Sequence, residues 1–114
     1  MPDESRIPTS FWVGGCLRRM DANACPYYVV KRGAGDSGTV LLKINLLNGS
    51  CRLLSQGRDS EGGMGWLSPF RHEEIAEQEA DAYIRRAMDR DPDLWVIEIE
   101  SKNGENPFEG GIPS

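Results

Sequence analysis

Residues 39–55 read TVLLKINLLNGSCRLLS, in which two apolar runs flank the pair Asn48-Gly49. An Asn-Gly pair supplies the positive-φ residues of a type I′ turn, so the segment predicts a β-hairpin with a two-residue loop. In that register Leu46 faces Cys51 and Ile44 faces Leu53. The predicted core residues are Val40, Leu42, Ile44, Leu46, Cys51 and Leu53. The residues predicted on the other, polar face are Lys43, Asn45 and Arg52.

Three more segments have strand patterns. Residues 27–32 are aromatic and β-branched, and together with the Gly-rich turn at 33–38 they predict a first hairpin with residues 39–47. Residues 94–100 alternate, which predicts a closing strand with Trp95, Ile97 and Ile99 on one side. Residues 64–67 predict a short edge strand.

Two segments have helical spacing. Residues 11–24 place Trp12, Cys16 and Met20 four apart behind Ser10, a suitable N-cap. Residues 72–90 carry acids near the start and arginines near the end, which matches the helix dipole. Their apolar face includes Ala80, Tyr83, Ile84 and Ala87. The predicted fold class is α+β: a mostly antiparallel sheet of four to five strands with both helices on one face.

A chain of 114 residues fits one domain. We expect a flexible N-terminus at 1–9, a single α+β domain at 10–101 and a disordered tail at 102–114, in which Phe108 docks transiently. The Gly-rich stretch 56–65 is predicted to be the mobile part of the domain.

Composition narrows the class of protein. The sequence shows neither a signal peptide nor an apolar run of the roughly 20 residues that span a bilayer, so we expect a soluble, cytoplasmic protein without membrane contact. Cys16, Cys25 and Cys51 are an odd number at irregular spacing, and His72 is the only histidine. We therefore expect free thiols, no metal and no cofactor.

Four segments together resemble a known family. They are Trp12-Val13 with Leu17-Arg18-Arg19, the run 29–33 (VVKRG), the run 42–45 (LKIN) leading to Asn48-Gly49, and the run 91–100 (DPDLWVIEIE). The set is similar to domain-of-unknown-function family 1491, small bacterial proteins found mainly in alphaproteobacteria. The chain departs from the expected pattern at Leu47 and Asn48, where a basic and then an acidic residue are expected. The resemblance implies a fold and a bacterial origin, and it carries no catalytic residue.

Charge is divided unevenly along the chain. Residues 1–58 contain 8 Lys or Arg against 4 Asp or Glu, and residues 59–114 contain 5 against 14. Either the two fields cancel in one compact domain, or the basic residues of the first half gather into a patch that holds phosphates. The residues of that patch would be Arg18, Arg19, Lys31, Arg32, Lys43 and Arg52. The acidic whole, with an isoelectric point near 4.8, makes nucleic acid the weaker alternative.

Glu98 and Glu100 point to the same side of their strand, about 7 Å apart. Two interpretations stay open: a water or ion between them in a small metal-assisted hydrolase, or a strand face paired with Lys43 or Arg52. The favoured function is a non-catalytic intracellular module that binds a protein partner, through the polar sheet face or through aromatics near Trp66 and Phe70. Candidate binding residues are Lys43, Arg52, Trp66, Glu98 and Glu100; no catalytic or metal-binding residue is assigned.

Overall fold

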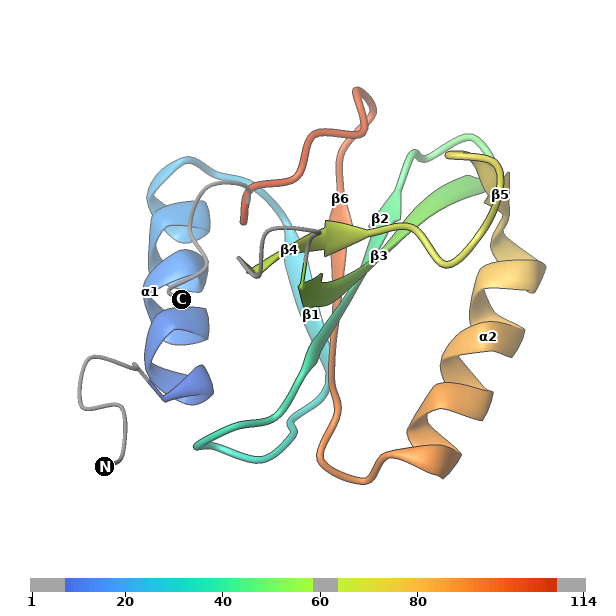
Figure 1. Ribbon diagram of the computed structural model, residues 1–114. Coiled ribbons are helices and arrows are strands. Elements are labelled where there is room, and N and C mark those ends of the chain that lie inside the picture. Colours follow the sequence, from blue (N-terminus) through green and yellow to red (C-terminus); the bar gives the residue numbers. More distant parts are fainter. Residues whose placement is uncertain (1–7, 59–63, 109–114) are drawn as a thin grey trace.

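The computed structural model describes residues 8–58 and 64–108, which form a sheet with one helix on each side (Figure 1). In chain order the elements are α1 (Thr9–Ala22), β1 (Tyr27–Lys31), β2 (Val40–Asn45), β3 (Ser50–Arg58), β4 (Met64–Leu67), β5 (Ile75–Ala76), α2 (Glu77–Arg90) and β6 (Trp95–Glu100). The predicted α+β class is confirmed. The sheet has six strands, one more than the upper end of the prediction, because the two-residue β5 also pairs with β3.

The strand order is β1-β6-β2-β3-β4, and β2–β6 is a parallel pair among antiparallel ones. The predicted first hairpin, in which β1 pairs with β2, is wrong: β6 lies between them. A parallel neighbour requires a long crossover connection, which the segment containing α2 supplies. β2 and β6 are the most buried strands, and central positions suit strands that are apolar on both faces.

The Gly-rich turn after β1 packs against the start of β6 instead of closing a hairpin. Ala34 donates its backbone N–H to Asp93 O at 2.9 Å, and its carbonyl accepts from the Trp95 indole at 2.8 Å. A Cβ at Gly33 or Gly38 would collide with Asp93 O and the Trp95 ring, so glycine is required for this close approach.

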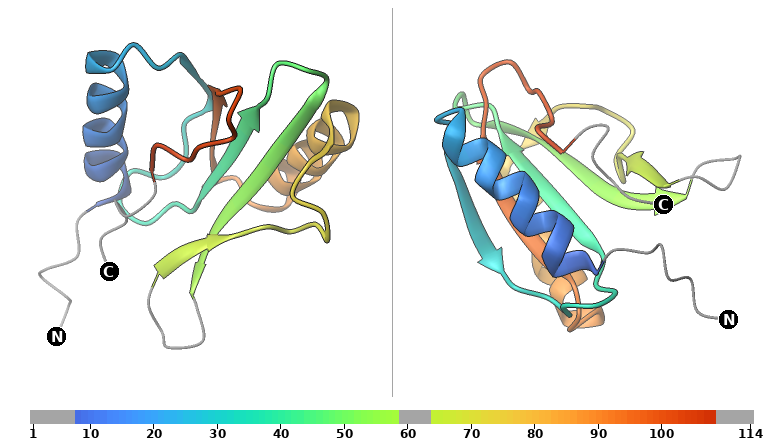
Figure 2. Two further views of the ribbon diagram at one scale, coloured as in Figure 1. Left: turned by 90° about the horizontal axis from the view of Figure 1, so that it is seen from above. Right: turned by 90° about the vertical axis from the view of Figure 1, so that its left-hand side faces the viewer.

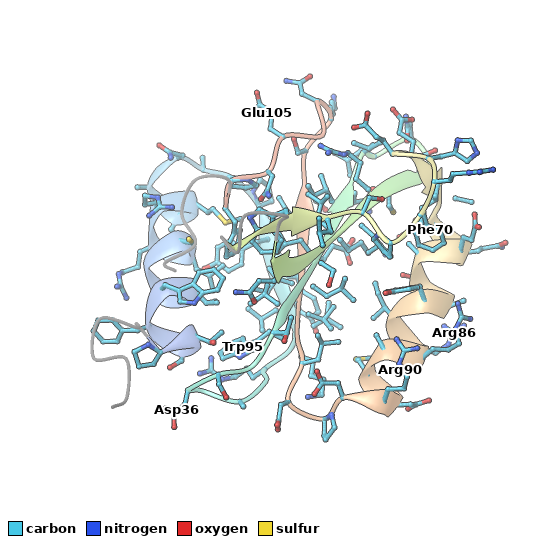
Figure 3. The ribbon with its side chains drawn as sticks, in the orientation of Figure 1. Asp36, Phe70, Arg86, Arg90, Trp95 and Glu105 are labelled. Carbon is cyan, nitrogen blue, oxygen red and sulfur yellow. The ribbon has the colours of Figure 1, made fainter. Side chains whose placement is uncertain are left out.

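The helices cover opposite faces, so the prediction of both on one face is wrong. α1 buries Trp12 and Met20 against Leu42, Ile44 and Ile97. α2 buries Ala80, Ile84 and Ala87 against a separate cluster, which contains Leu41, Cys51, Leu53 and Val96. β2 is buried on both sides because Leu41, between the predicted core positions, is itself 1% exposed. Figure 3 shows Trp95 on the α1 side and Phe70 on the α2 side.

The β2–β3 hairpin exists, and its register is one residue away from the prediction. Asn45 pairs with Cys51 and Lys43 with Leu53, and Leu46 N–H binds Ser50 O around the three-residue loop 47–49. Leu47 and Gly49 adopt positive φ, 63° and 88°. The shift moves Cys51 and Leu53 to the α2 face, away from Leu42 and Ile44.

Several boundaries also differ from expectation. α1 begins at Thr9, so Ser10 lies inside the helix and is not its N-cap. α2 begins at Glu77, because residues 75–76 pair with β3 before the helix starts. β3 extends to Arg58, into the stretch predicted to be mobile, and residues 59–63 lie outside the described part.

The domain continues past residue 101 to Phe108, whose fully buried side chain packs edge-on against Trp12 and Trp66, each at 6.0 Å between ring centroids. The rest of the predicted tail, 109–114, and the N-terminal residues 1–7 are likewise outside the description.

Candidate functional site

The α2 side of the sheet contains a buried lysine. Lys43 is 5% exposed, and its Nζ lies 2.8 Å from Glu77 Oε2, 2.8 Å from Asp81 Oδ1 and 3.7 Å from Glu98 Oε1. Central strand β2 places the lysine under the first turns of α2, from which Glu77 and Asp81 reach it. Lys43 therefore does not lie on an open polar face, because α2 covers its part of the sheet.

Burial alone lowers the pKa of Lys43. Hydrogen bonds to Asp81 and Glu77 and the charge of Glu98 outweigh that effect, so the pKa stands above its ordinary value of 10.5. The side chain is consequently a fixed cation, and a lysine in that state is neither a nucleophile nor a general base. Next to it, burial raises the pKa of the Cys51 thiol to about 11, which also makes that thiol unreactive.

Glu98 lies between the buried Lys43 and the open part of the sheet. Its Oε2 accepts a hydrogen bond from Asn45 Nδ2 at 3.1 Å while its Oε1 faces Lys43. Register places Tyr28 directly opposite Glu98 on β1, as Lys43 is opposite on β2. The interpretation of Glu98 as part of a charged strand face paired with Lys43 agrees with this geometry.

Beyond Glu98 the sheet face is hollowed. A hollow of about 180 Å³ is lined by Pro26, Tyr27, Tyr28, Glu98 and Glu100. Glu98 keeps 25% of its side chain exposed, and no described cation pairs with Glu100. A second hollow, about 250 Å³, lies between the sheet and the C-terminal end of α2. Both are smaller than the roughly 300–1,000 Å³ that hold drug-sized ligands.

β1 lies at one margin of the sheet, and β4 at the other (Figure 2, right). Glu100 N–H donates to Pro26 O at 3.1 Å, which makes residues 26 and 100 a hydrogen-bonded pair. Such pairs alternate along an antiparallel ladder, so Tyr28 also bonds to β6, and the backbone groups of Tyr27 and Val29 turn outward. In the described part of the chain no strand pairs with that edge.

The edge of β1 is apolar where it is exposed. Tyr28 is 67% exposed and Val30 41%. Lys31, the charged residue that could guard the edge, instead binds the carbonyls of Pro92 at 2.6 Å and Leu94 at 3.2 Å. The ladder shifts between Val29 and Lys31, which limits the regular edge to a few residues.

Arg52 and Trp66 lie elsewhere. Arg52 is on the α1 side, donates to Gly104 O and lies 3.5 Å from Glu73. Trp66 is half-buried, with its ring against Phe108, and Phe70 packs on Tyr83 at 5.4 Å. The predicted basic face does not form, because Lys43 and Arg52 occupy opposite sides of the sheet.

Comparison with known families identifies the chain. The family model for protein of unknown function DUF1491 matches residues 7–109. This chain belongs to the DUF1491 family. A crystal structure of a DUF1491 family protein from Caulobacter crescentus is 33% identical, with a TM-score of 0.78, over 93% of this chain and 97% of that one. An NMR structure of a DUF1491 family protein from the same organism gives 33% identity and a TM-score of 0.75, over 93% and 94%.

A third DUF1491-like fold is that of protein Atu0922 from A. tumefaciens. It is 24% identical, with a TM-score of 0.65, over 84% of this chain and 86% of that one, and so it supports the fold alone. A search of curated proteins found no significant match. Both organisms are alphaproteobacteria, in agreement with the expected origin. Within residues 8–58 and 64–108, this DUF1491 chain has no helix long and apolar enough to cross a membrane.

The structure of this DUF1491 chain brings together three of the five predicted site residues: Lys43, Glu98 and Glu100 share one face. Metal chemistry there lacks support, because Glu98 is occupied by Asn45 and Lys43, and no three His, Cys, Asp or Glu side chains of the described residues form a metal-binding group. Sequence reasoning missed Pro26 and Tyr28. No local pattern indicates them, because they border the site only where β1 lies next to β6.

Proposed function

We propose that this DUF1491 protein is a non-catalytic, cytoplasmic interaction module that binds an extended segment of a partner protein along the free edge of β1. One observation carries the proposal: β1 ends the sheet with the backbone groups of Tyr27 and Val29 directed outward and with Tyr28 and Val30 exposed. Strand addition uses such an edge, with backbone hydrogen bonds for affinity and alternate side chains for specificity.

The local design favours binding a short segment over open-ended aggregation. Proteins protect edge strands with prolines, bulges, short strands and charged residues. β1 has a proline before it at 26 and a bulge after Val29, so only a few residues are open. The charge of Lys31 is held at the Pro92 and Leu94 carbonyls, so the open part keeps its apolar character.

The remaining chemistry supports binding over catalysis. Desolvation raises the pKa of all three thiols above their ordinary value, and Lys43 is held as a cation by carboxylates. Groups in those states are weak nucleophiles. Free cysteines are also typical of a reducing compartment, which supports a cytoplasmic location.

The test uses peptides selected from a displayed random library against the intact protein. Hydrogen exchange measured by NMR should show the amides of Tyr27 and Val29 becoming protected when a selected peptide binds. Val29→Pro removes an outward N–H without removing a bond to β6, and it should abolish binding while the fold survives. Phe11→Ser, which removes an exposed aromatic on α1, is the matched control and should bind normally.

Two results would contradict the proposal. One is undiminished peptide binding by a folded Val29→Pro variant. The other is protection of Tyr27 and Val29 that grows with protein concentration alone, because the occupant of the edge would then be a second copy of the chain.

A further inference from the structure

The hollow beside β1 indicates the chemistry of the partner. We infer that it receives a lysine or arginine side chain from the segment that pairs with β1, an inference that rests on the proposed function. In the hollow the ring of Tyr28 shares a face with the carboxylates of Glu98 and Glu100, whereas the ring of Tyr27 lies on the α1 side, where its hydroxyl donates to Asp21. A ring beside carboxylates suits a cation on a hydrocarbon stem, since the ring contacts the stem or the charge and the carboxylates accept its hydrogen bonds.

The α2 side of the sheet carries more negative than positive charge around the hollow. One ammonium group, that of Lys43, faces the carboxylates of Glu77, Asp81 and Glu98, and Glu100 adds a fourth without a described cation. The half-exposed Glu77 and Asp81 side chains lie on the α2 side of Lys43, whereas Glu98 and Glu100 border the hollow. A basic side chain in the hollow would offset the excess negative charge, and the net charge of −5 on the whole chain also attracts a basic partner.

The distance from an added strand to Glu98 requires a long side chain. A strand added to β1 would lie two strand spacings from β6, about 10 Å away. Its residue opposite Tyr28 would project to the same face as Glu98, because paired residues share a face. Among side chains, lysine and arginine combine the length needed to cross Tyr28 with a positive end. The hollow, at about 180 Å³, suits one side chain better than a cofactor.

The inference is tested with three capped pentapeptides of alternating valine and threonine that differ only at the centre: arginine, lysine or norleucine. Binding is measured by NMR titration of the intact protein at low salt. The arginine and lysine peptides should bind at least about tenfold more tightly than the norleucine peptide, and the difference should shrink as salt rises. Glu100→Gln should remove most of that preference without altering the fold, because its side chain is exposed.

Glu79→Gln, an exposed acid on α2 outside the hollow, is the matched control and should keep the preference. Equal binding of all three peptides, still abolished by Val29→Pro, would overturn this inference and leave the edge-binding function standing. A basic preference that Glu100→Gln removes but Val29→Pro does not affect would support the hollow and overturn edge pairing. A preference unchanged by Glu100→Gln would place the basic contact elsewhere and overturn the inference.

Discussion

For Lys43 the sequence predicts the correct face of β2 but not the burial of the side chain. Its place between Leu42 and Ile44 correctly indicates the opposite face of β2 from theirs. The sequence alone does not reveal that α2 covers that face, since Glu77 and Asp81 meet Lys43 only through tertiary packing. The like-charged pair at i and i+4 on α2 would repel without the ammonium between its members.

We expect Lys43→Met to lower the free energy of unfolding by about 2–3 kcal/mol at pH 7, because three carboxylates would then face one another across a partly dry site. Partial exposure of Glu77 and Asp81 keeps the loss below that of a fully buried pair. Urea denaturation measures it. Lys102→Met, which changes an exposed lysine, is the control and should stay within about 0.5 kcal/mol of the wild type.

The comparison of wild type with Lys43→Met also predicts how the free energy of unfolding changes with pH. The pKa of Lys43 is raised on folding, so its stabilisation is complete below the unfolded value near 10.5 and declines above it. The difference between wild type and Lys43→Met should therefore hold from pH 7 to 9 and shrink above pH 10.5. Both proteins should carry Cys51→Ala, which removes the thiol that titrates near pH 11. A difference that grows with alkaline pH would contradict a raised pKa.

The hairpin of β2 and β3 is the element that the sequence indicates most directly, although its predicted register is wrong by one residue. Asn48-Gly49 marks the turn correctly, yet the loop also includes Leu47, which gives three residues and a one-residue shift. Two local hydrogen bonds favour the longer loop: Asn45 Oδ1 accepts from Leu47 N–H at 2.8 Å, and Asn48 Oδ1 from Ser50 N–H at 3.0 Å. A pattern of turn-forming residues does not specify which side chain makes such bonds.

Leu47→Asn should raise the free energy of unfolding by about 0.5–1 kcal/mol. Leu47 has φ 63°, a left-handed conformation that costs a leucine more than an asparagine. Its side chain is 49% exposed, so little burial is lost. Leu67→Asn is the matched control, the same substitution at the same exposure in β4, where φ is not positive, and it should not stabilise. Thermal denaturation compares the two; equal effects would remove backbone strain as the cause.

Strand order is a property of the whole molecule, and local patterns do not determine it. The alternation of β6 and the apolar run of β2 identify two strands, but only the packing of both helices shows that these strands are central. The candidate site depends on this order, because Tyr28 meets Glu98 only when β6 lies next to β1. Its acidic members could therefore be found from sequence, whereas its aromatic wall could not.

The segment after β6 closes the α1 side of the molecule. Gly104 has φ 72° and is packed against Leu46 and Arg52, and its carbonyl accepts from the Arg52 guanidinium. Asn106 Oδ1 accepts the Phe108 N–H at 2.8 Å, which fixes the backbone as the ring enters the cluster between Trp12 and Trp66. A low average apolar content after residue 101 hides this single anchoring side chain.

Phe108→Ala should lower the free energy of unfolding by about 3 kcal/mol, because it leaves a cavity between two indole rings at a position with no solvent exposure. Phe11→Ala is the matched control: that ring is 72% exposed, and its loss should change stability by about 0.5 kcal/mol or less. Urea denaturation gives both values. In native Phe108→Ala the tryptophan emission should also shift to longer wavelength, since Trp12 and Trp66 lose a common neighbour and gain water. If the two variants were equally stable, the segment after β6 would lie on the surface of a core that is complete without it. The expected difference in their free energies of unfolding would instead make Phe108 part of the core that holds α1 to the sheet.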